Sequence, residues 1–469
     1  MSFDYDVVVI GSGPAGEKAA NKAAYFGKRV AVVEREAVTG GNCTLGGIPA
    51  NLLREAALTW SGIRRRMLDE GGRRAFQMRE LRHAVSEVCS ARDQRVRSFF
   101  ERFGVEWLHG DAAFEDPHTL RVHDGRSERH VSSAFFVVAT GARASRPPSV
   151  PFNDVNVLSA DNALRLERLP ESLVVVGAGV IGSEYASIFA ALGVEVQFVD
   201  EREHPLDFLD SEVASHLFGE FARRGIQVHL GAAVKTCRAL SPTEVMVETS
   251  RGRALRAQAL LYSGGREANT EALALDRIGV RLGRRGRPVV DTWFRTAVPH
   301  IYAVGDVIGP PGRAATAVEQ GRVAIAHAFS DDESLASRPD VVAGDRAVPY
   351  SLIPFALYTV PAVAMVGSRE DDLLAAGTPG IVGRASYADQ DRGWVLGDVQ
   401  GLLKLVCDAH SQRVLGVHVV GEGAEEIVHL GQACMHFEGT LEYFVRAVFN
   451  LPTLSAVYKA AAYDALSKL

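Results

Sequence analysis

Val7-Val8-Val9-Ile10-Gly11-Ser12-Gly13-Pro14-Ala15-Gly16 is the stretch that decides the fold of this chain. Its four consecutive apolar residues predict a strand buried on both faces, as in a parallel sheet. Gly11, Gly13 and Gly16 follow at GxGxxG spacing, and a helical pattern begins directly after them. The first glycine permits a tight turn, the second lets a pyrophosphate approach the backbone, and the third lets helix and strand pack closely. The stretch therefore predicts a dinucleotide phosphate cradle.

The next strand supports this interpretation. Val30 to Val33 is again continuously apolar, and it ends in Glu34. An acidic residue at this place can accept hydrogen bonds from the two hydroxyls of a ribose. A glycine-rich turn alone is the alternative explanation of the glycines, but strand, turn, helix, strand and acid in this order favour a dinucleotide site.

A second unit of the same kind lies further along the chain. Leu173 to Val176 leads into Gly177-Ala178-Gly179-Val180-Ile181-Gly182, and the following apolar strand ends in Asp200. Two independent units predict two dinucleotides, each with its own Rossmann domain. Asp200 would accept hydrogen bonds from the ribose hydroxyls of NAD, whereas Arg202 could pair with the 2′-phosphate of NADP; a surface arginine in an acidic turn is the alternative. NADH is favoured, and NADPH stays open.

Composition limits the partners and the compartment. The 469 residues carry a formal net charge of −6, which argues against nucleic acid or an anionic membrane as the main partner. No apolar run reaches the roughly 18 residues of a spanning helix, and the acidic start is not typical of a signal peptide. The five cysteines are scattered without metal-ligand spacing. We expect a cytoplasmic protein without a metal site.

Composition shifts predict the domain organisation. Pro147, Pro148 and Pro151 mark a linker, and the character of the sequence changes again at Pro349. The fold class predicted is α/β, with two Rossmann-like domains and a C-terminal α+β domain. The predicted boundaries are 1–150 and 271–346 for the first nucleotide domain, 151–270 for the second and 347–469 for the third.

Periodicity predicts further elements. A helical pattern begins at Leu52, and two surface helices are expected between Gly62 and Phe103 with a break at Gly71-Gly72. Short strands are expected over 106–131, followed by a separate apolar strand at 135–139. In the third domain the predicted strands are 362–366, 402–407 and 414–420, and the predicted helices are 424–438 and 441–448.

Five motifs together carry a family resemblance. They resemble the flavoprotein disulfide reductase family, which includes lipoamide dehydrogenase and glutathione reductase, and the likeness covers essentially the whole chain. Within the family, the sequence is most similar to the soluble pyridine nucleotide transhydrogenase branch. The motifs are Gly11 to Gly16, Gly40-Gly41-Asn42-Cys43, Ala139-Thr140-Gly141, Gly177 to Glu184 and Tyr302-Ala303-Val304-Gly305-Asp306.

The resemblance implies cofactors and a quaternary structure. It implies FAD in the first domain, with Glu34 on the adenosine ribose and Asp306 on the ribitol chain, and NAD(P)H in the second, with Glu184 near the nicotinamide carboxamide. A turn-capping role is the alternative for Asp306, and an exposed helix position is the alternative for Glu184. A homodimer through the C-terminal domain is implied as well. The predicted cofactor-binding residues are Gly11, Gly13, Pro14, Ala15, Gly16, Glu34, Arg35, Gly41, Asn42, Cys43, Thr140, Gly141, Arg143, Gly177, Gly179, Ile181, Gly182, Glu184, Asp200, Arg202, Gly265, Gly305 and Asp306.

The sequence departs from the disulfide-reducing members of the family at four places. Those members carry a second cysteine five positions after the first, a lysine two residues beyond the Ile-Pro, and a His–Glu pair near the C-terminus. Here Cys43 stands alone, Gly47 and Asn51 occupy the cysteine and lysine positions, and Leu451 and Ala456 replace the pair. Disulfide exchange needs two thiols and a base, so these departures argue against disulfide reduction.

The predicted activity follows from what is kept and what is lost. We expect an FAD-dependent oxidoreductase that passes hydride from a nicotinamide nucleotide to a second acceptor, with Glu184 as the candidate catalytic residue. Cys43 is either a working thiol or a small packed residue. The first choice of acceptor is a second nicotinamide nucleotide, and the second is a quinone. A redox-sensing or scaffolding subunit without free turnover is the alternative from another class.

Overall fold

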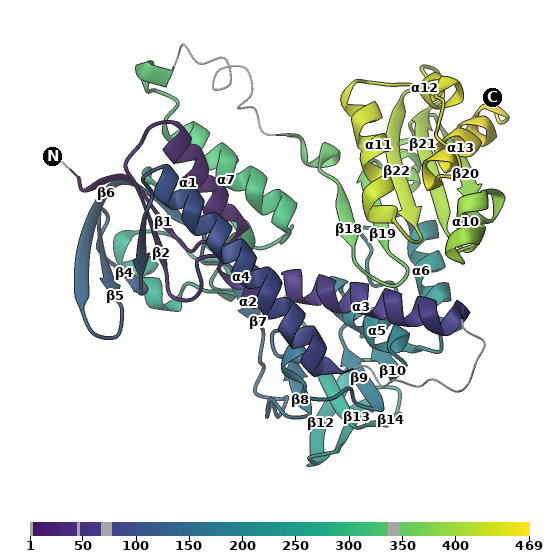
Figure 1. The fold of residues 1–469 in the computed structure, drawn as a ribbon, viewed down its shortest axis with the longest axis horizontal. Coiled ribbons are helices and arrows are strands. Elements are labelled where there is room, and N and C mark those ends of the chain that lie inside the picture. Colours follow the sequence, from purple (N-terminus) through teal and green to yellow (C-terminus); the bar gives the residue numbers. More distant parts are fainter. Residues whose placement is uncertain (1–2, 45–46, 67–76, 336–347) are drawn as a thin grey trace. The chain divides into compact units, whose positions relative to one another are not determined.

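The computed structural model describes residues 3–44, 47–66, 77–335 and 348–469, and its ribbon is drawn in Figure 1. The chain forms two compact units, each assembled from three segments. Unit 1 comprises Met1–Ala50, Arg79–Ser145 and Gly265–Val348, and unit 2 comprises Asn51–Met78, Arg146–Gly264 and Pro349–Leu469.

Unit 1 is built on a sheet with β1 (Tyr5–Ile10) at its centre. β1 pairs in parallel with β2 (Val30–Glu34) and with β6 (Glu128–Val138), so that Val8 lies opposite both Ala31 and Phe136. β3 (Glu106–His109) continues the sheet beside β2, and β17 (Ile301–Ala303) pairs with β6. The predicted buried parallel strands are confirmed.

β6 is longer than the sequence suggested. Its first half pairs antiparallel with β5 (Thr119–His123), which in turn pairs with β4 (Asp111–Asp116). The prediction of a separate strand at 135–139 is wrong, because the half-exposed residues that pair with β5 run without a break into the buried half that pairs with β1. A two-stranded pair of β7 (Ala142–Ala144) and β16 (Arg266–Ala268) completes the strands of this unit.

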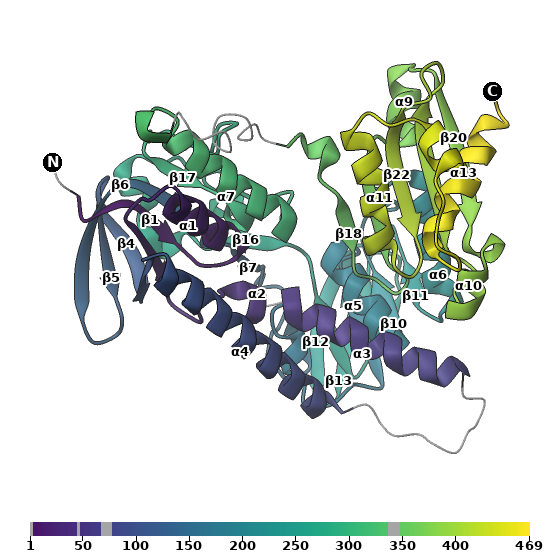
Figure 2. The ribbon, with the colours of Figure 1, turned by 45° about the horizontal axis from the view of Figure 1, so that its top comes forward.

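Two layers cover the sheet of unit 1. On one face, α1 (Pro14–Tyr25), α4 (Met78–Arg102) and α7 (Ala314–Ala328) bury Val7 and Val9, and α1 and α7 lie side by side (Figures 1 and 2). The opposite face carries the alternate residues, such as Val8 and Ile10, and packs against the β4–β5 hairpin. Alternation of this kind follows from the two-residue period of a strand.

The helices after the first nucleotide unit begin earlier than predicted. A short helix, α2 (Gly41–Thr44), precedes α3 (Gly47–Arg66), so the helix expected from Leu52 starts five residues sooner. Pro49 falls in the first turn of α3, where its missing N–H would have no intrahelical partner. Of the two helices expected between Gly62 and Phe103, the second is confirmed as α4, whereas residues 62–66 are the end of α3 and not a separate helix. The predicted break at Gly71-Gly72 lies outside the described residues.

Unit 2 contains the second nucleotide sheet. β9 (Ser172–Val176) lies between β10 (Glu195–Val199) and β15 (Ala259–Tyr262), with β11 (Gln227–His229) and β8 (Val157–Ser159) at the edges, and every pair is parallel. The remaining elements here are α5 (Val180–Ala191), α6 (Ser211–Arg223) and an antiparallel sheet, not predicted from the sequence, of β12 (Val234–Ser241), β13 (Glu244–Thr249) and β14 (Ala254–Ala257).

The C-terminal part of unit 2 is a five-stranded antiparallel sheet with helices. The three strands and two helices predicted here are found within two residues of their expected bounds. The strands at 355–357 and 380–386 and the helices at 370–376, 391–396 and 457–466 were not predicted. In sheet order the strands are β18 (Phe355–Leu357), β19 (Val363–Gly367), β22 (Val414–Val420), β21 (Leu402–Asp408) and β20 (Gly380–Ser386). The helices are α9 (Glu370–Ala376), α10 (Asp391–Leu396), α11 (Ala424–His436), α12 (Leu441–Arg446) and α13 (Val457–Leu466).

A buried charge cluster joins α6 to this antiparallel sheet within unit 2. The Nζ atom of Lys404, a residue 1% exposed, lies 2.9 Å from Asp210, 2.9 Å from Glu212 and 2.6 Å from Glu370. Arg384 forms a second ion pair with Glu212 at 2.8 Å. Three carboxylates around one buried ammonium compensate its loss of water.

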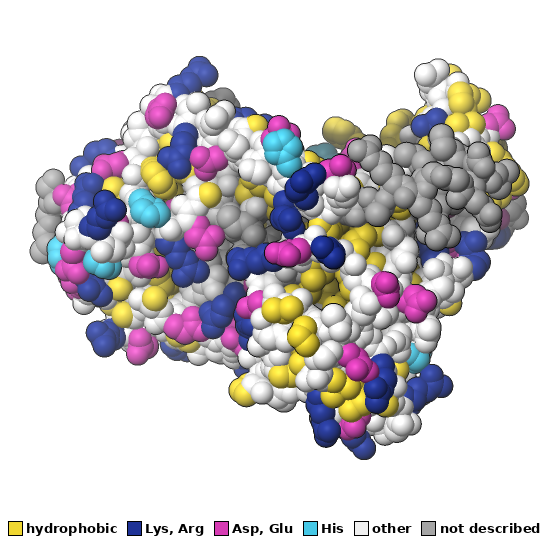
Figure 3. All heavy atoms as spheres, turned by 60° about the horizontal axis from the view of Figure 1, so that its bottom comes forward, with side chains coloured by type: hydrophobic (Ala, Val, Ile, Leu, Met, Phe, Trp, Pro, Cys, Tyr) yellow, Lys and Arg dark blue, Asp and Glu magenta, His cyan; other side chains and the backbone are white. Residues whose placement is uncertain are grey.

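On the face drawn in Figure 3, acidic and basic side chains are interspersed, so this face has no large patch of one charge sign. In the part of the chain that the structure describes, no helix is long and apolar enough to cross a membrane.

Candidate nucleotide-binding sites

The first glycine turn has the steric properties that its spacing predicts. Gly11 has φ +97°, and a Cβ there would lie 2.5 Å from the Ala139 carbonyl oxygen. A Cβ on Gly16 would lie 1.9 Å from the Gly11 oxygen, whereas a Cβ on Gly13 would meet nothing within 4 Å. Two of the glycines are therefore required by packing, and the middle one leaves the space that a pyrophosphate needs.

Glu34 lies beside this turn. One carboxylate oxygen accepts hydrogen bonds from the Ser12 amide and hydroxyl, both at 3.0 Å, and the other accepts from the Glu36 amide at 3.0 Å. The end of β2 thus brings an acceptor to the start of α1. No side chain caps α1 at Gly13, so its first amide groups are available to an anion.

The segment before α2 forms the next wall of this site. Gly40 has φ +56°, and a Cβ there would lie 2.8 Å from the Gly13 nitrogen. The Cys43 amide donates to the Gly40 carbonyl at 3.3 Å, and the Cys43 side chain is buried. Gly41 begins α2, and the side chain of Asn42 lies outside the described residues. The buried Thr39 hydroxyl has no hydrogen-bond partner in the described part of the chain.

Asp306 comes from a distant segment to the same edge of the sheet. β17 and β1 both pair in parallel with β6, so the carboxyl ends of the three strands point the same way. Gly305 has φ +80°, its amide donates to the Gln320 side chain at 2.7 Å, and a Cβ on it would contact Ala15 at 3.0 Å. The Asp306 carboxylate lies 3.9 Å from the Arg266 guanidinium. Ligands bind at such carboxyl edges in open α/β sheets.

The turn after β6 holds further predicted residues. The Thr140 carbonyl accepts from the Asn269 side chain at 3.0 Å, and the buried Thr140 hydroxyl lacks a partner among the described residues. Gly141 has φ +68°, in the left-handed region. Arg143 is engaged by carboxylates, because Glu267 lies 3.3 Å from its guanidinium and Glu271 pairs with it as well.

Four further predicted residues of unit 1, Pro14, Ala15, Arg35 and Gly265, lie at different places in this unit. Pro14 opens α1, and Ala15 is buried. Arg35 is half-exposed and lies 4.0 Å from Asp111. The Gly265 carbonyl accepts a hydrogen bond from the Ser145 amide at 2.9 Å.

These observations fit the first site to a dinucleotide such as FAD. An uncapped helix start and the open space at Gly13 suit a pyrophosphate. The buried hydroxyls of Thr39 and Thr140, which lack a protein partner in the described residues, are groups that a ligand can satisfy.

The second glycine turn repeats the first. Gly177 has φ +101°, a Cβ on Gly182 would lie 1.8 Å from the Gly177 oxygen, and a Cβ on Gly179 would meet nothing within 4 Å. The Ser263 hydroxyl lies 2.9 Å from the carbonyl oxygens of both Val176 and Gly177 and holds the turn against β15. Ser263 was not predicted as a site residue, although it directly follows the apolar strand that closes this sheet.

Asp200 and Arg202 do not act independently of each other. The buried Asp200 carboxylate accepts from the Ala178 amide at 2.5 Å and from the Arg202 guanidinium at 2.9 Å. Burial alone would raise the pKa of Asp200, but the hydrogen bonds from Arg202 and from the backbone outweigh it and lower the pKa. The Arg202 side chain remains 49% exposed, so its other face is open to solvent and to a ligand.

Glu184 faces the segment that follows β18, within the same unit. Its carboxylate accepts from the Tyr358 amide at 3.0 Å, and the Ser187 hydroxyl, one turn further along α5, accepts from the Val360 amide at 3.0 Å. The buried Arg54 donates to the Thr359 carbonyl at 3.1 Å. Arg54, Tyr358 and Ser187 were not predicted, because nothing local in the sequence places 54, 187 and 358 together.

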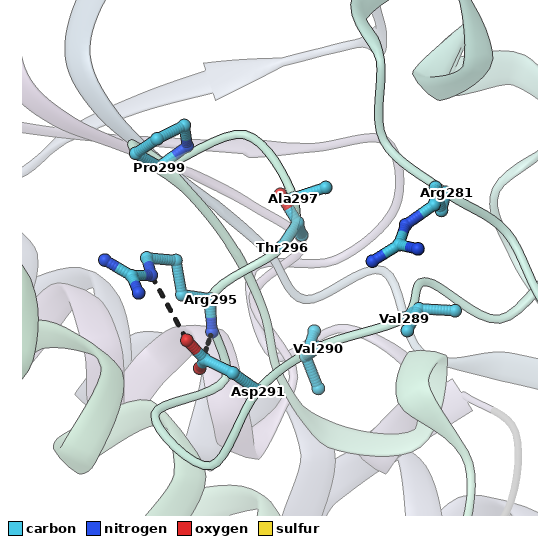
Figure 4. A pocket seen from close by; sticks show the side chains of 8 residues that line it. All are labelled: Arg281, Val289, Val290, Asp291, Arg295, Thr296, Ala297 and Pro299. Carbon is cyan, nitrogen blue, oxygen red and sulfur yellow. Dashed lines mark hydrogen bonds and ion pairs between the residues drawn. The ribbon is translucent and has the colours of Figure 1, made fainter.

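A cavity of about 410 Å³ lies elsewhere in unit 1 (Figure 4). Its lining includes none of the predicted site residues, and Figure 4 shows Arg295 turned toward Asp291, with which it pairs at 3.2 Å. The cavity is lined by Arg281, Val289, Val290, Asp291, Arg295, Thr296, Ala297 and Pro299.

Two phosphate cradles, each at the carboxyl ends of parallel strands, define a protein that binds two dinucleotides, the architecture of a flavin-dependent nucleotide oxidoreductase. The family model described as pyridine nucleotide-disulphide oxidoreductase matches residues 5–321, and the model of the dimerisation domain of this family matches residues 353–462. The chain belongs to the pyridine nucleotide-disulphide oxidoreductase family. It is an FAD-dependent oxidoreductase of pyridine nucleotides, and the predicted fold class and cofactors are confirmed.

Curated relatives match over nearly the full length. The chain is 40% identical to the soluble pyridine nucleotide transhydrogenase of Mycobacterium tuberculosis, across 99% of this chain and 98% of that protein. It is 38% identical to the protein of the same name from Chromohalobacter salexigens, across 99% of both.

Solved structures show the same fold. LpdA from Mycobacterium tuberculosis superposes with a TM-score of 0.87 at 24% identity, over 97% of this chain and 98% of that one. The HOCl-induced flavoprotein disulfide reductase RclA from Escherichia coli gives a TM-score of 0.84 at 23% identity, over 98% of this chain and 99% of that one.

Proposed function

We propose that this protein is a transhydrogenase that moves hydride between NAD(H) and NADP(H) through FAD. The observation that carries the proposal is the Asp200–Arg202 pair at the end of β10. A site that serves both nucleotides must tolerate a ribose with and without a 2′-phosphate. Asp200 supplies an acceptor for ribose hydroxyls, and the exposed face of Arg202 supplies a cation for the phosphate.

The paired geometry explains how one site accepts both nucleotides. An isolated Asp200 would repel a 2′-phosphate, but its charge is compensated by Arg202 at 2.9 Å. Arg202 in turn has 49% of its side chain exposed, so it can contact a phosphate without leaving Asp200. Relatives at 38–40% identity that carry the transhydrogenase name support this assignment.

The residues lost from the disulfide-reducing pattern favour a nucleotide over a disulfide as acceptor. Gly47 cannot resolve a mixed disulfide with Cys43, and Leu451 and Ala456 offer neither a base nor its orienting carboxylate. Hydride transfer between nucleotides needs neither thiol nor base, because positioning supplies most of its catalysis.

In this proposal each unit holds one cofactor. Gly11, Gly13, Glu34 and Asp306 bind FAD, which when bound accepts a hydride from one nucleotide and returns it to another. Gly177, Gly179, Ile181 and Gly182 hold the nicotinamide nucleotide in unit 2, and Glu184, which contacts the Tyr358 amide, orients its carboxamide.

The proposal includes the arrangement of the chain. The first nucleotide domain spans 1–150 and 271–346, the second 151–270, and the C-terminal domain 347–469. The dimerisation-domain match at residues 353–462 supports a homodimer. Relatives named as soluble proteins support a cytoplasmic location.

Anaerobic titration of the purified holoenzyme tests the proposal. NADPH and NADH are each expected to bleach the flavin absorbance, and thio-NAD⁺ is expected to restore it within turnover time. A protein whose flavin is reoxidised by quinones but not by thio-NAD⁺ would be a quinone reductase instead. Bleaching that no small acceptor reverses would indicate a subunit without free turnover, and a chain that takes up no FAD would overturn the assignment.

A further inference from the structure

Two of the five cysteines lie side by side in unit 1. The Cys89 thiol on α4 is 3.4 Å from the Cys43 carbonyl oxygen, although 46 positions separate the two residues. The side chain of Cys43 is also a hydrogen-bonding neighbour of the Cys89 thiol. Both residues are reduced in this structure, and Cys89 is partly exposed whereas Cys43 is buried.

We propose that Cys43 and Cys89 form a reversible intramolecular disulfide when the protein meets a hydroperoxide. The Cys43 sulfur lies on the short helix α2 and the Cys89 sulfur on the long helix α4. The contact of the Cys89 thiol with the Cys43 carbonyl and side chain places the two cysteines next to each other, as a disulfide requires. The inference concerns a covalent modification and stands independently of which electron acceptor the enzyme uses.

The reaction balances with the hydroperoxide as the oxidant. The Cys43 sulfur attacks the terminal oxygen of ROOH, which breaks the O–O bond, releases ROH and leaves Cys43 as a sulfenic acid. The Cys89 sulfur then attacks the Cys43 sulfur, and the hydroxyl leaves as water with the Cys89 proton. In total, two thiols lose two electrons and two protons, and ROOH becomes ROH and water.

The order of the two steps follows from the surroundings of Cys89. Burial and the neighbouring Cys43 raise the pKa of Cys89 to about 12, against a smaller opposite effect of Arg92. Cys89 therefore stays protonated at neutral pH, and a protonated thiol is a poor nucleophile toward peroxide. In this proposal Cys43 reacts first and Cys89 resolves, an order that dimedone trapping in Cys89→Ser tests.

A second cysteine pair in the chain serves as an internal control. Cys407 on β21 is completely buried, and Cys434 on α11 is near enough to influence it electrostatically. Burial raises the pKa of Cys407 to about 12. Both side chains belong to the apolar core of the C-terminal part of unit 2. The two cysteines are close together in both pairs, but only the first pair contains a partly exposed cysteine, Cys89.

Peptide mapping of the full-length holoenzyme tests the proposal. The protein is treated with hydrogen peroxide, alkylated with N-ethylmaleimide in denaturant so that buried free thiols also react, digested with trypsin without reduction and analysed by mass spectrometry. We expect a cross-link between peptides 36–54 and 83–92, the loss of two titratable thiols and full recovery with dithiothreitol. Cys407 and Cys434 are expected to remain alkylated.

A single variant checks the role of Cys89. In Cys89→Ser, Cys43 is expected to stop at the sulfenic acid, where dimedone traps it, and to proceed to sulfinic acid with excess peroxide. The wild-type digest decides the proposal even if this variant folds poorly. Overoxidation of Cys43 in the wild type with Cys89 still free, cross-links between separate chains, or unreacted thiols at both positions would each overturn it.

Discussion

The two glycine turns have the same backbone conformation, but the acidic residue beside each turn has different hydrogen-bond partners. The third glycine of each would place a Cβ within 2 Å of a carbonyl oxygen, at 1.9 Å for Gly16 and 1.8 Å for Gly182. Among the described residues, Glu34 accepts hydrogen bonds from Ser12 and from the Glu36 amide, whereas Asp200 also accepts from the Arg202 guanidinium. Packing thus fixes the glycine turns, and in the function that we propose the residues after the second strand decide which nucleotide each turn accepts.

The largest expected effect comes from breaking either cradle. Gly16→Ala should yield protein without bound flavin, because the added Cβ forces helix and strand apart at a cost of about 1–3 kcal/mol or more. Gly182→Ala should keep its flavin but lose reduction by both nucleotides. Flavin absorbance per chain and anaerobic reduction measure the two outcomes.

The exposed Gly219 within α6 provides the matched control for these two variants. A Cβ there would meet nothing within 4 Å, so Gly219→Ala should stabilise the helix by about 0.5–1 kcal/mol and leave both sites intact. A Gly182→Ala protein that is reduced at the normal rate would contradict the equivalence of the two turns.

The next largest effect is expected at Arg202 and tests the difference between the two glycine turns. Arg202→Gln keeps a donor for Asp200 but removes the charge, so the KM for NADPH should rise about tenfold to a hundredfold. The KM for NADH should change by less than about threefold. Steady-state kinetics with each nucleotide measure the split, and Arg256→Gln, which removes an exposed ion pair with Glu244 in the same unit, is the control. Equal changes in the KM values for NADH and NADPH would show that Arg202 does not discriminate between the two nucleotides.

A smaller effect is expected at Ser263, whose hydroxyl holds the second turn. Ser263→Ala should raise the KM for both nucleotides about fivefold, the equivalent of one hydrogen bond of about 1 kcal/mol, without loss of flavin. Ser172→Ala, which removes a hydroxyl that accepts from the Gln258 amide at the other end of β9, should leave the KM values unchanged. Loss of flavin from Ser263→Ala would show that the two cradles are not independent.

The smallest effect concerns pH and is confined to unit 2. Hydrogen bonds from Arg384, with a further contribution from Lys404, lower the pKa of Glu212 to about 2 from 4.5. A depressed folded pKa stabilises the protein above pH 4.5, and this contribution is lost as the pH falls from about 4.5 to 2. Because Glu212 is partly exposed, the loss should stay below about 1 kcal/mol.

Urea unfolding at several pH values measures this contribution. Glu212→Gln should flatten the acid limb of the stability profile, whereas the exposed Glu442→Gln on α12 should not. An unchanged acid limb in Glu212→Gln would assign the acid sensitivity of unit 2 to other carboxylates.

The sequence predicted what is encoded locally. Both glycine turns, the strands beside them and Asp306 at the end of β17 follow from short motifs with a clear steric or chemical reason. The helix start at Gly47 was missed because the helical pattern is evident in the sequence only from Leu52, although Pro49 fits a first turn. β20 and α13 lack a strong apolar period and are stabilised by packing against each other.

Long-range contacts could not be predicted in the same way. Arg202 was expected to pair with a 2′-phosphate or to lie at the surface of an acidic turn, whereas its contact with Asp200 depends on the turn after β10. The approach of Tyr358 to Glu184 joins positions 174 apart, and that of Cys89 to Cys43 joins positions 46 apart. Such contacts depend on how elements pack, and no local propensity encodes them.

The discontinuity of unit 1 has a consequence for synthesis on the ribosome. A nascent chain that has emerged only as far as residue 264 contains all strands of the second nucleotide sheet but lacks β17 and α7 of the first. The apolar side of α1 that α7 later covers is then exposed, together with one edge of β6. The second nucleotide sheet can therefore fold during translation, whereas the first can be completed only after its last segment has emerged.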